Sequence, residues 1–371
     1  MLKDICRNSK KFKFFILILS ILIAVCVGSV CLSSCSSNNT PSNSQNQEKQ
    51  SFTDTSGREV TFNKDIKKYV VTGNIGQITL YALDPDRLSA LAVAWSDSTK
   101  KYINEKYLNL DILGEIYGGK QDFSKEELLK INPDLIIDIG QAKNSIKEDM
   151  DNLQNQTSIP VIHFDGDIQN FPYIYRSLGK ILDREEKAEK IASFCETTYN
   201  NAKSFAQTKT GNMPSLLYCL EKEGCNVMCK NSYHAGIIDM LSNNVAVVDS
   251  PTSKGTGNEV DFEQILKWDP DVLIFAPNSC YSKVKDDPKW NQLKAVQNNK
   301  YFEVPGQPYN WMGYPPAMHQ SLGFLWLEKL LYGNEANYDL KSKVEEAYKL
   351  FFDYSLTDDE YSTLIKNSIS K

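Results

Sequence analysis

The sequence lacks the motifs on which the common enzyme classes depend. It contains no G-x-S-x-G elbow, no P-loop, no G-x-G-x-x-G after a predicted strand and no H-E-x-x-H. Two of the three loop acids Asp122, Asp165 and Asp167 could form a catalytic carboxylate pair, but acidic loop residues are usually only solvated. We therefore predict that the protein is not an enzyme, and keep an enzyme as the alternative of another class.

Acidic residues outnumber basic ones, and arginine is scarce. The chain has a formal net charge of −6, and its first 34 residues hold five basic groups against one acid, so the remainder carries about −10. Because proteins bind nucleic acids through lysine and arginine on the phosphates, a chain this acidic is a poor partner for them. The arginines after residue 34 are Arg58, Arg87, Arg176 and Arg184.

Potential metal ligands are few and poorly spaced. The three histidines are His163, His234 and His319. A bare metal ion needs three or four converging ligands, which the loops do not supply, so we predict neither a metal site nor an intrinsic cofactor. The cysteines after Cys35 are Cys195, Cys219, Cys225, Cys229 and Cys280. The spacing from Cys219 to Cys229, with His234 beyond it, is not a standard zinc pattern, so structural thiols or one disulfide are favoured over a metal or redox role.

The first 35 residues predict an export signal. A basic segment precedes an almost unbroken apolar run over residues 14–30, and Leu-Ser-Ser-Cys then matches the lipobox of bacterial lipoproteins. We predict a signal peptide over residues 1–34 and lipidation at Cys35, with a retained transmembrane anchor as the alternative. In both cases the protein lies at the extracytoplasmic face of the cell membrane, and residues 35–50, rich in Ser, Asn and Gln, form a flexible tether.

Two similar segments flank a long predicted helix. The helix covers residues 184–207, with Asp183 as its N-cap, and is about 36 Å long. The segments EELLKINPDLII, from Glu126, and EQILKWDPDVLI, from Glu263, each predict a helix that ends at a Pro-Asp pair and a buried strand of a parallel sheet. We predict an α/β fold of two lobes, each a mostly parallel sheet with flanking helices, joined by one long helix. Two αβ units within one larger sheet are the alternative.

The remaining patterns set the expected boundaries. We predict an N-terminal α/β lobe over residues 51–170, a connecting helical region over 171–210, a C-terminal α/β lobe over 211–334 and a C-terminal helical extension over 335–371. A hairpin is expected over residues 52–62. Further strands are expected over 69–71, 91–94, 134–139, 160–164, 215–220, 245–248, 272–275 and 301–304, and helices over 78–83, 236–241 and 316–331.

An ordered set of motifs resembles a known family. It comprises TDTSGREV near the start, the segment 114–134 ending in Asn-Pro-Asp, Leu-Gly and Asp-Arg-Glu before the long helix, and WMGYPPAMHQSLGFLW over 311–326. Together these resemble the substrate-binding lipoproteins that serve ABC importers of iron complexes (siderophores), cobalamin or haem. The resemblance covers residues 52–332 and implies the class III periplasmic-binding-protein fold, two Rossmann-like lobes with the ligand in the cleft between them.

The resemblance also implies partners. Glu126 and Glu263 match the acids that form salt bridges with arginines of the permease dimer, whose cytoplasmic ATPases drive release. The alternative is that both are first-turn glutamates favoured by a helix N-terminus. The protein itself is expected to be a monomer, and a single connecting helix implies that the cleft closes little on its ligand.

Loops at the carboxyl ends of the predicted strands are expected to line the cleft. The candidate ligand-binding residues are Trp95, Tyr117, Lys120, Tyr233, His234, Lys254, Trp311 and Tyr314. Any of the aromatic residues can instead belong to the core. Relatives often carry arginine where this chain has Tyr314, and the shortage of arginine favours a neutral or weakly charged chelate. The expected ligand is a metal chelate, with a ferric siderophore as first choice and a corrinoid, haem or a nickel or cobalt chelate as alternatives.

Overall fold

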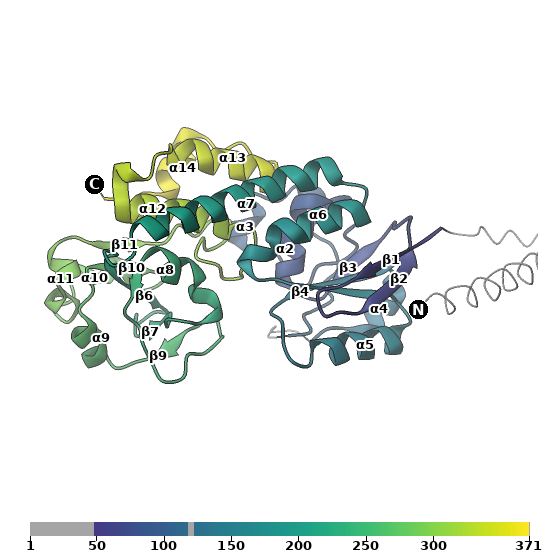
Figure 1. Cartoon of the computed structure of the whole chain (residues 1–371), viewed down its shortest axis with the longest axis horizontal. Coiled ribbons are helices and arrows are strands. Elements are labelled where there is room, and N and C mark those ends of the chain that lie inside the picture. Colours follow the sequence, from purple (N-terminus) through teal and green to yellow (C-terminus); the bar gives the residue numbers. More distant parts are fainter. Residues whose placement is uncertain (1–47, 118–121, 371) are drawn as a thin grey trace, which may run out of the picture. The chain divides into compact units, whose positions relative to one another are not determined.

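The computed structural model describes residues 48–117 and 122–370. The predictions for the signal peptide, Cys35 and Lys120 fall outside these residues. The described chain forms two α/β lobes that share one long helix, as the sequence predicts (Figure 1). None of its helices combines the length and the apolar character that a membrane span requires.

The N-terminal lobe is built on a parallel sheet of three strands, β3 (Tyr69–Val71), β4 (Leu135–Gly140) and β5 (Val161–Asp165), with β4 in the middle. Alternate residues of each strand face opposite sides, so one face packs with α4 (Lys125–Ile131) and α5 (Ile146–Thr157). The other face belongs to the large core, with α2 (Asn74–Leu83) and α6 (Phe171–Ile181). The predicted hairpin is confirmed as β1 (Lys49–Thr53) and β2 (Glu59–Asn63).

The C-terminal lobe repeats this plan. Its central strand β10 (Val272–Phe275) lies between β6 (Ser215–Leu220) and β11 (Tyr301–Glu303), all parallel. Three short strands extend the sheet: β7 (Asn226–Val227), β8 (Asn243–Asn244) and β9 (Asn258–Glu259). Two predicted strands are wrong. Residues 91–94 make only an isolated bridge, from Leu91 to Ile112, and residues 245–248 lie just beyond β8.

The matching Pro-Asp segments have the same backbone geometry in both lobes. Helices α4 and α9 (Phe262–Trp268) are each seven residues long and end at a left-handed residue, Asn132 (φ 49°) and Asp269 (φ 35°). Asparagine and aspartate tolerate this conformation, and the proline that follows cannot continue the helix. Each segment therefore turns directly into the central strand of its sheet.

The aspartate of each Pro-Asp pair ties two neighbouring strands together. Asp134 Oδ2 accepts hydrogen bonds from the backbone N–H groups of Lys67 (2.7 Å) and Lys68 (2.9 Å), just before β3. Asp271 Oδ2 accepts them from the N–H (3.0 Å) and hydroxyl (2.6 Å) of Ser215, at the start of β6. The repeat in the sequence thus reflects the same strand-joining contact in both lobes.

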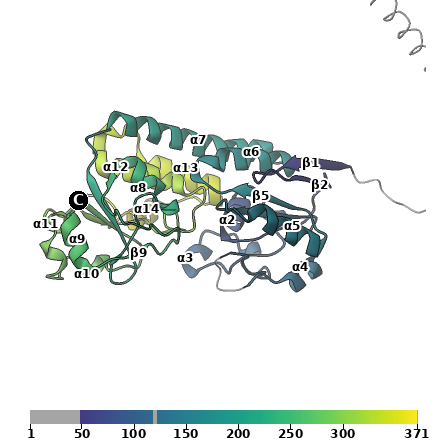
Figure 2. The same cartoon turned by 60° about the horizontal axis from the view of Figure 1, so that its bottom comes forward.

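The long helix α7 (Glu185–Thr208) lies within one residue of its predicted limits. It packs against α6 on one side and against α12 (Gln320–Tyr332) and α8 (Gly236–Leu241) on the other, so it contacts both lobes (Figure 2). The predicted N-cap is wrong: Asp183 has a left-handed backbone (φ 51°), and Arg184 is the N-cap without a side-chain cap. Helix α12 begins at Gln320, four residues later than predicted.

The C-terminal extension is helical as predicted, and it contacts both lobes. Helix α13 (Leu340–Phe352) packs against α12, α7 and α2. Near α14 (Asp358–Leu364), Glu360 pairs with Lys101 at 2.6 Å, and the ring of Tyr354 lies 4.9 Å from that of Tyr102. The remaining short helices are α3 (Asp97–Lys100), α10 (Tyr281–Val284), α11 (Lys294–Gln297) and the 3-10 turns Pro85–Arg87, Glu105–Tyr107, Ile168–Asn170, Tyr233–Ala235, Trp290–Gln292 and Gly333–Glu335.

Candidate ligand-binding site

A pocket of about 400 Å³ opens at the carboxyl ends of the C-terminal lobe strands. Its walls are the segments that follow β6, β10 and β11, and the N-terminal lobe contributes Ser96 and Ser98. Ligands of α/β proteins bind outside the carboxyl ends of parallel strands, where loops from neighbouring strands converge. The position of this pocket therefore makes it the candidate ligand site.

Two polar side chains of the pocket hold each other in place. The Asn310 side-chain amide donates to the Tyr218 hydroxyl at 2.8 Å, and the Asn310 Oδ1 accepts from the N–H of Met312 at 2.9 Å. The Ser279 hydroxyl is buried and finds no hydrogen-bond partner among the described residues. A buried hydroxyl without a partner is unfavourable, so Ser279 is available to bond to a ligand.

His234 is the buried imidazole of the pocket. Its Nδ1 donates to the carbonyl oxygen of Gly313 at 3.1 Å, since a carbonyl can only accept. Burial lowers the pKa of His234, and hydrogen bonding to the backbone carbonyls of Gly313 and Ser253 opposes this shift. The rings of Tyr233 (5.1 Å) and Tyr314 (6.0 Å) both meet the imidazole at steep angles.

Tyr314 forms an exposed edge of the pocket. Its side chain is 57% exposed, and its ring lies against the backbone of Gly255. A Cβ at position 255 would come within 2.1 Å of the ring, so only glycine permits this contact. Tyr314 therefore offers an aromatic face at the pocket entrance.

Hydrogen bonds connect the two lobes beside this pocket. The Tyr233 hydroxyl donates to the carbonyl oxygen of Gly166, at the end of β5, at 3.1 Å. The Thr99 hydroxyl donates to the carbonyl oxygen of Pro308 at 3.0 Å. Tyr233 thus contacts the opposite lobe in this structure and does not line the pocket.

The structure places two residues that were predicted to contact the ligand, both tryptophans, in the core. Trp95 is 4% exposed, and its indole N–H donates to the carbonyl oxygen of Tyr107 at 2.9 Å. Trp311 is fully buried, and its N–H donates to the carbonyl oxygen of Gln307 at 3.1 Å. Large apolar rings with a satisfied N–H are stable core components, and the pocket is reached instead by their neighbours Ser96 and Met312.

The other predicted contacts lie apart from the pocket. Tyr117 lines a separate hollow of about 310 Å³ in the N-terminal lobe, where its hydroxyl donates to Asp149 at 2.6 Å and the Lys143 ammonium lies 3.7 Å from its ring centre. Lys254 is exposed and is not part of the pocket wall. Of the seven candidates among the described residues, the pocket brings together His234 and Tyr314.

The two glutamates predicted to dock the permease are placed equivalently. Glu126 lies in the first turn of α4 with its side chain 80% exposed, where it pairs with Lys130 at 3.0 Å. Glu263 lies in the first turn of α9 and is also exposed. Both carboxylates are therefore accessible to a partner, and both also satisfy the preference of a helix N-terminus for acids.

Sequence reasoning missed most of the polar pocket residues. These are Ser96, Ser98, Tyr218, Lys222, Asn278 and Ser279. The signal for Lys222, Asn278 and Ser279 is their place in the segments that follow β6 and β10. Lys222 and Glu221 are the charged residues in the wall, which contains no arginine.

No metal site accompanies the pocket. Among residues 48–117 and 122–370, no three His, Cys, Asp or Glu side chains come close enough to hold a metal ion. The five cysteines of this part of the chain are free thiols, and four of them are buried. The cysteines near His234 therefore do not assemble into the metal site that their residue types suggest.

Known proteins share this fold and sequence pattern. A model of the periplasmic binding protein family matches residues 79–308. The chain is 27% identical over 301 residues to the Fe(3+)-citrate-binding protein YfmC of Bacillus subtilis (strain 168). The aligned segment covers 78% of this chain and 89% of that protein.

Solved structures agree with this match. An ABC transporter solute binding protein from Sulfurospirillum deleyianum superposes with a TM-score of 0.78 and 27% identity, over 85% of this chain and 99% of the other. A periplasmic solute binding protein from Veillonella parvula superposes with a TM-score of 0.73 and 24% identity, over 86% and 98%. The family model matches more than half of the length of this chain, and the chain therefore belongs to the periplasmic binding protein family.

Proposed function

We propose that the protein is the substrate-binding subunit of an ABC importer and captures a metal chelate in the pocket between Ser96 and the β6, β10 and β11 loops. The observation that carries this proposal is the pocket itself, at the strand ends of a two-lobed binding protein. The iron-citrate relative supports a chelated iron as cargo. The protein performs no chemistry in this role, and the metal keeps the ligands of its chelator.

The pocket chemistry favours a neutral or weakly charged chelate. Hydroxyl, amide and imidazole groups dominate its polar surface, with Lys222 as the cation of the wall. A strongly anionic complex would need several cationic partners. A ferric siderophore of the hydroxamate type fits best. A corrinoid, haem, or a nickel or cobalt chelate is the alternative, and ferric citrate, the cargo in the relative's name, is the anionic competitor.

Recognition in this pocket rests on groups that are already positioned. The Asn310 amide and the Tyr218 hydroxyl are oriented by each other, and Ser279 and His234 add a hydroxyl and an imidazole ring. Aromatic Tyr309 and Tyr314 supply contact area with few rotatable bonds. A preformed pocket loses little conformational entropy when it binds a ligand.

The test is a titration of residues 36–371, which contain the whole folded unit, with a ferric hydroxamate, a ferric catecholate, ferric citrate, cobalamin and haem by isothermal calorimetry. We expect sub-micromolar binding of one neutral chelate, weakened about tenfold by Asn310→Ala, the loss of about one hydrogen bond. Tyr117→Phe, in the separate hollow, is the matched control and should leave the affinity unchanged. Binding of none of these complexes would refute the function, and preference for the catecholate or citrate would refute the neutral ligand.

The remaining parts of this proposal concern the membrane. Lipidation at Cys35 would hold the protein at the extracytoplasmic face, with residues 35–50 as the tether. Glu126 and Glu263, one on each lobe, would present two equivalent carboxylates to a permease dimer. Incorporation of labelled palmitate, lost in Cys35→Ser, tests the anchor separately from ligand binding.

A further inference from the structure

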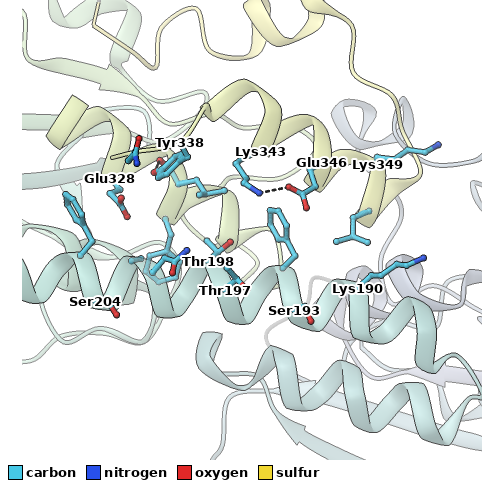
Figure 3. Close-up of a pocket in the computed structure, with 18 of the residues that line it drawn as sticks. Lys190, Ser193, Thr197, Thr198, Ser204, Glu328, Tyr338, Lys343, Glu346 and Lys349 are labelled. Carbon is cyan, nitrogen blue, oxygen red and sulfur yellow. Dashed lines mark hydrogen bonds and ion pairs between the residues drawn. The ribbon is translucent and has the colours of Figure 1, made fainter. Parts of the chain in front are cut away.

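A groove of about 1360 Å³ shares no residue with the proposed chelate pocket. Figure 3 shows its two walls, the long helix α7 and helix α13, with residues of α12 between them. It runs along α7 from Lys187 to Thr208, about 30 Å at the helical rise. This volume exceeds the roughly 300–1,000 Å³ of ordinary small-molecule pockets, so the groove suits an elongated ligand.

Apolar side chains form the body of the groove. Phe194 and Phe205 come from α7, Phe324 and Leu325 from α12, and Leu350 from α13. Aromatic contacts hold these walls in place, for example between the rings of Phe194 and Phe351 at 5.6 Å. The apolar body therefore favours a hydrocarbon or aromatic chain as its occupant.

One acid lies within these apolar walls. Glu328 is only 6% exposed, and its carboxylate makes no hydrogen bond or ion pair with any described residue. In Figure 3 it lies beside Tyr338, on the side of the groove that faces α7. Burial raises the pKa of the Glu328 carboxyl to about 7. An acid without a partner that lines a cavity is a candidate binding group.

The neighbouring cations are engaged elsewhere. The Lys329 ammonium donates to the carbonyl oxygens of Ala336 (2.9 Å) and Tyr338 (3.2 Å), and Lys209 pairs with Glu335. Lys329 therefore makes no ion pair with Glu328, although its charge opposes the rise in the pKa of that carboxyl. Among the described residues, this end of the groove therefore lacks a positively charged group that forms an ion pair with Glu328.

The opposite end of the groove is lined by four lysines, Lys187, Lys190, Lys343 and Lys349. Three of them pair with acids: Lys349 with Asp353 at 2.6 Å, Lys343 with Glu346 at 2.7 Å and Lys190 with Glu186 at 2.7 Å. Lys187 makes no ion pair with a described residue, and burial lowers the pKa of its ammonium. Paired surface lysines attract a further anion only weakly. At the Glu328 end, charge complementarity therefore points to a cationic head group.

We propose that the groove between α7, α12 and α13 is a second binding site, for an elongated amphiphile whose ammonium head group pairs with Glu328. The hydrocarbon part would lie along Phe205, Phe324 and Leu325. Aromatic rings near the head, Tyr338 among them, add cation–π attraction. An anionic amphiphile would meet a buried carboxylate, and a neutral one would leave that carboxylate unpaired.

The test is calorimetric titration of residues 36–371 with octyltrimethylammonium, with octanoate as the anionic amphiphile for comparison. We expect saturable binding of the ammonium in the micromolar to low millimolar range and none of octanoate. Glu328→Gln, which keeps the shape and removes the charge, should weaken binding about tenfold or more. Glu346→Gln is the matched control, because it removes an exposed acid of the same groove, and should leave the affinity within about twofold.

A second variant tests the location of the site. Asn201 is exposed on the α7 wall, so Asn201→Trp should narrow the groove without disturbing the core, and should weaken binding of the ammonium. The proposal is overturned if the wild type shows no saturable binding, if octanoate binds as tightly, or if Glu328→Gln retains the wild-type affinity. Circular dichroism of each variant separates loss of the site from loss of the fold.

Discussion

The burial of Glu328 leads to a prediction about stability that does not depend on any ligand. Its carboxyl is buried without a partner, and burial raises its pKa from 4.5 to about 7 in the folded protein. The folded state therefore keeps this proton to a higher pH than the unfolded state. Stability falls as the pH rises from 4.5 through 7, because ionisation then costs more in the fold than in the unfolded chain.

The magnitude follows from the two pKa values. At about 1.4 kcal/mol for each pH unit between them, ionised Glu328 would destabilise the fold by about 3 kcal/mol at pH 8 if it were fully shielded from water. Because Glu328 lines a groove that is open to solvent, we expect about 1–2 kcal/mol at pH 8 and almost nothing at pH 4.5. Glu328→Gln carries no charge at any pH, so it should be more stable than the wild type at pH 8, by up to this amount, and similar to it at pH 5.

Urea unfolding of residues 36–371 at pH 5, 6, 7 and 8 measures this difference, provided that the dependence on denaturant is the same for both proteins. Glu346→Gln, an exposed and paired acid, should show no such trend. A Glu328→Gln protein that is equally or less stable than the wild type at pH 8 would refute the reasoning, since the carboxylate would then have a stabilising partner.

Three further predictions concern other parts of the molecule. Gly255→Ala should displace the exposed ring of Tyr314 and weaken chelate binding severalfold, with little change in melting temperature; an unchanged affinity in calorimetry would remove Tyr314 from the site. Asp271→Ala should lower the free energy of unfolding by about 1–2 kcal/mol, because the start of β6 loses its charged hydrogen-bond acceptor, and a smaller loss in urea titrations would contradict this role. Replacing both Glu126 and Glu263 with lysine should reduce cellular uptake more than tenfold while chelate affinity in vitro stays the same; normal uptake would exclude docking through these acids.

The fold was largely predictable because it depends on local patterns. The Pro-Asp segments specify a helix end and a strand start within a few residues, and the same segment occurs in both lobes. The apolar stripe of α7 places that helix within one residue of its observed limits. The family resemblance, drawn from motifs spread over the chain, is confirmed by the family match.

The binding residues were less predictable because strand-end loops do not reveal which side chain turns inward. The sequence predicted that Trp95 lines the cleft. In the structure its ring is buried in the core, and the neighbouring Ser96 lines the pocket. Ser279 and Tyr218 carry no special pattern in the sequence. They become pocket residues only because β6 and β10 lie side by side in the sheet.

By itself, the sequence determined the α/β lobes, the connecting helix and the equivalence of Glu126 and Glu263, since helix periodicity, proline and strand patterns act over short distances. Only the tertiary structure decided which aromatic rings are core, that the C-terminal extension contacts both lobes, and that Glu328 lines a groove without a partner. These features depend on contacts between residues far apart in the chain, such as Lys101 with Glu360. No local pattern encodes them.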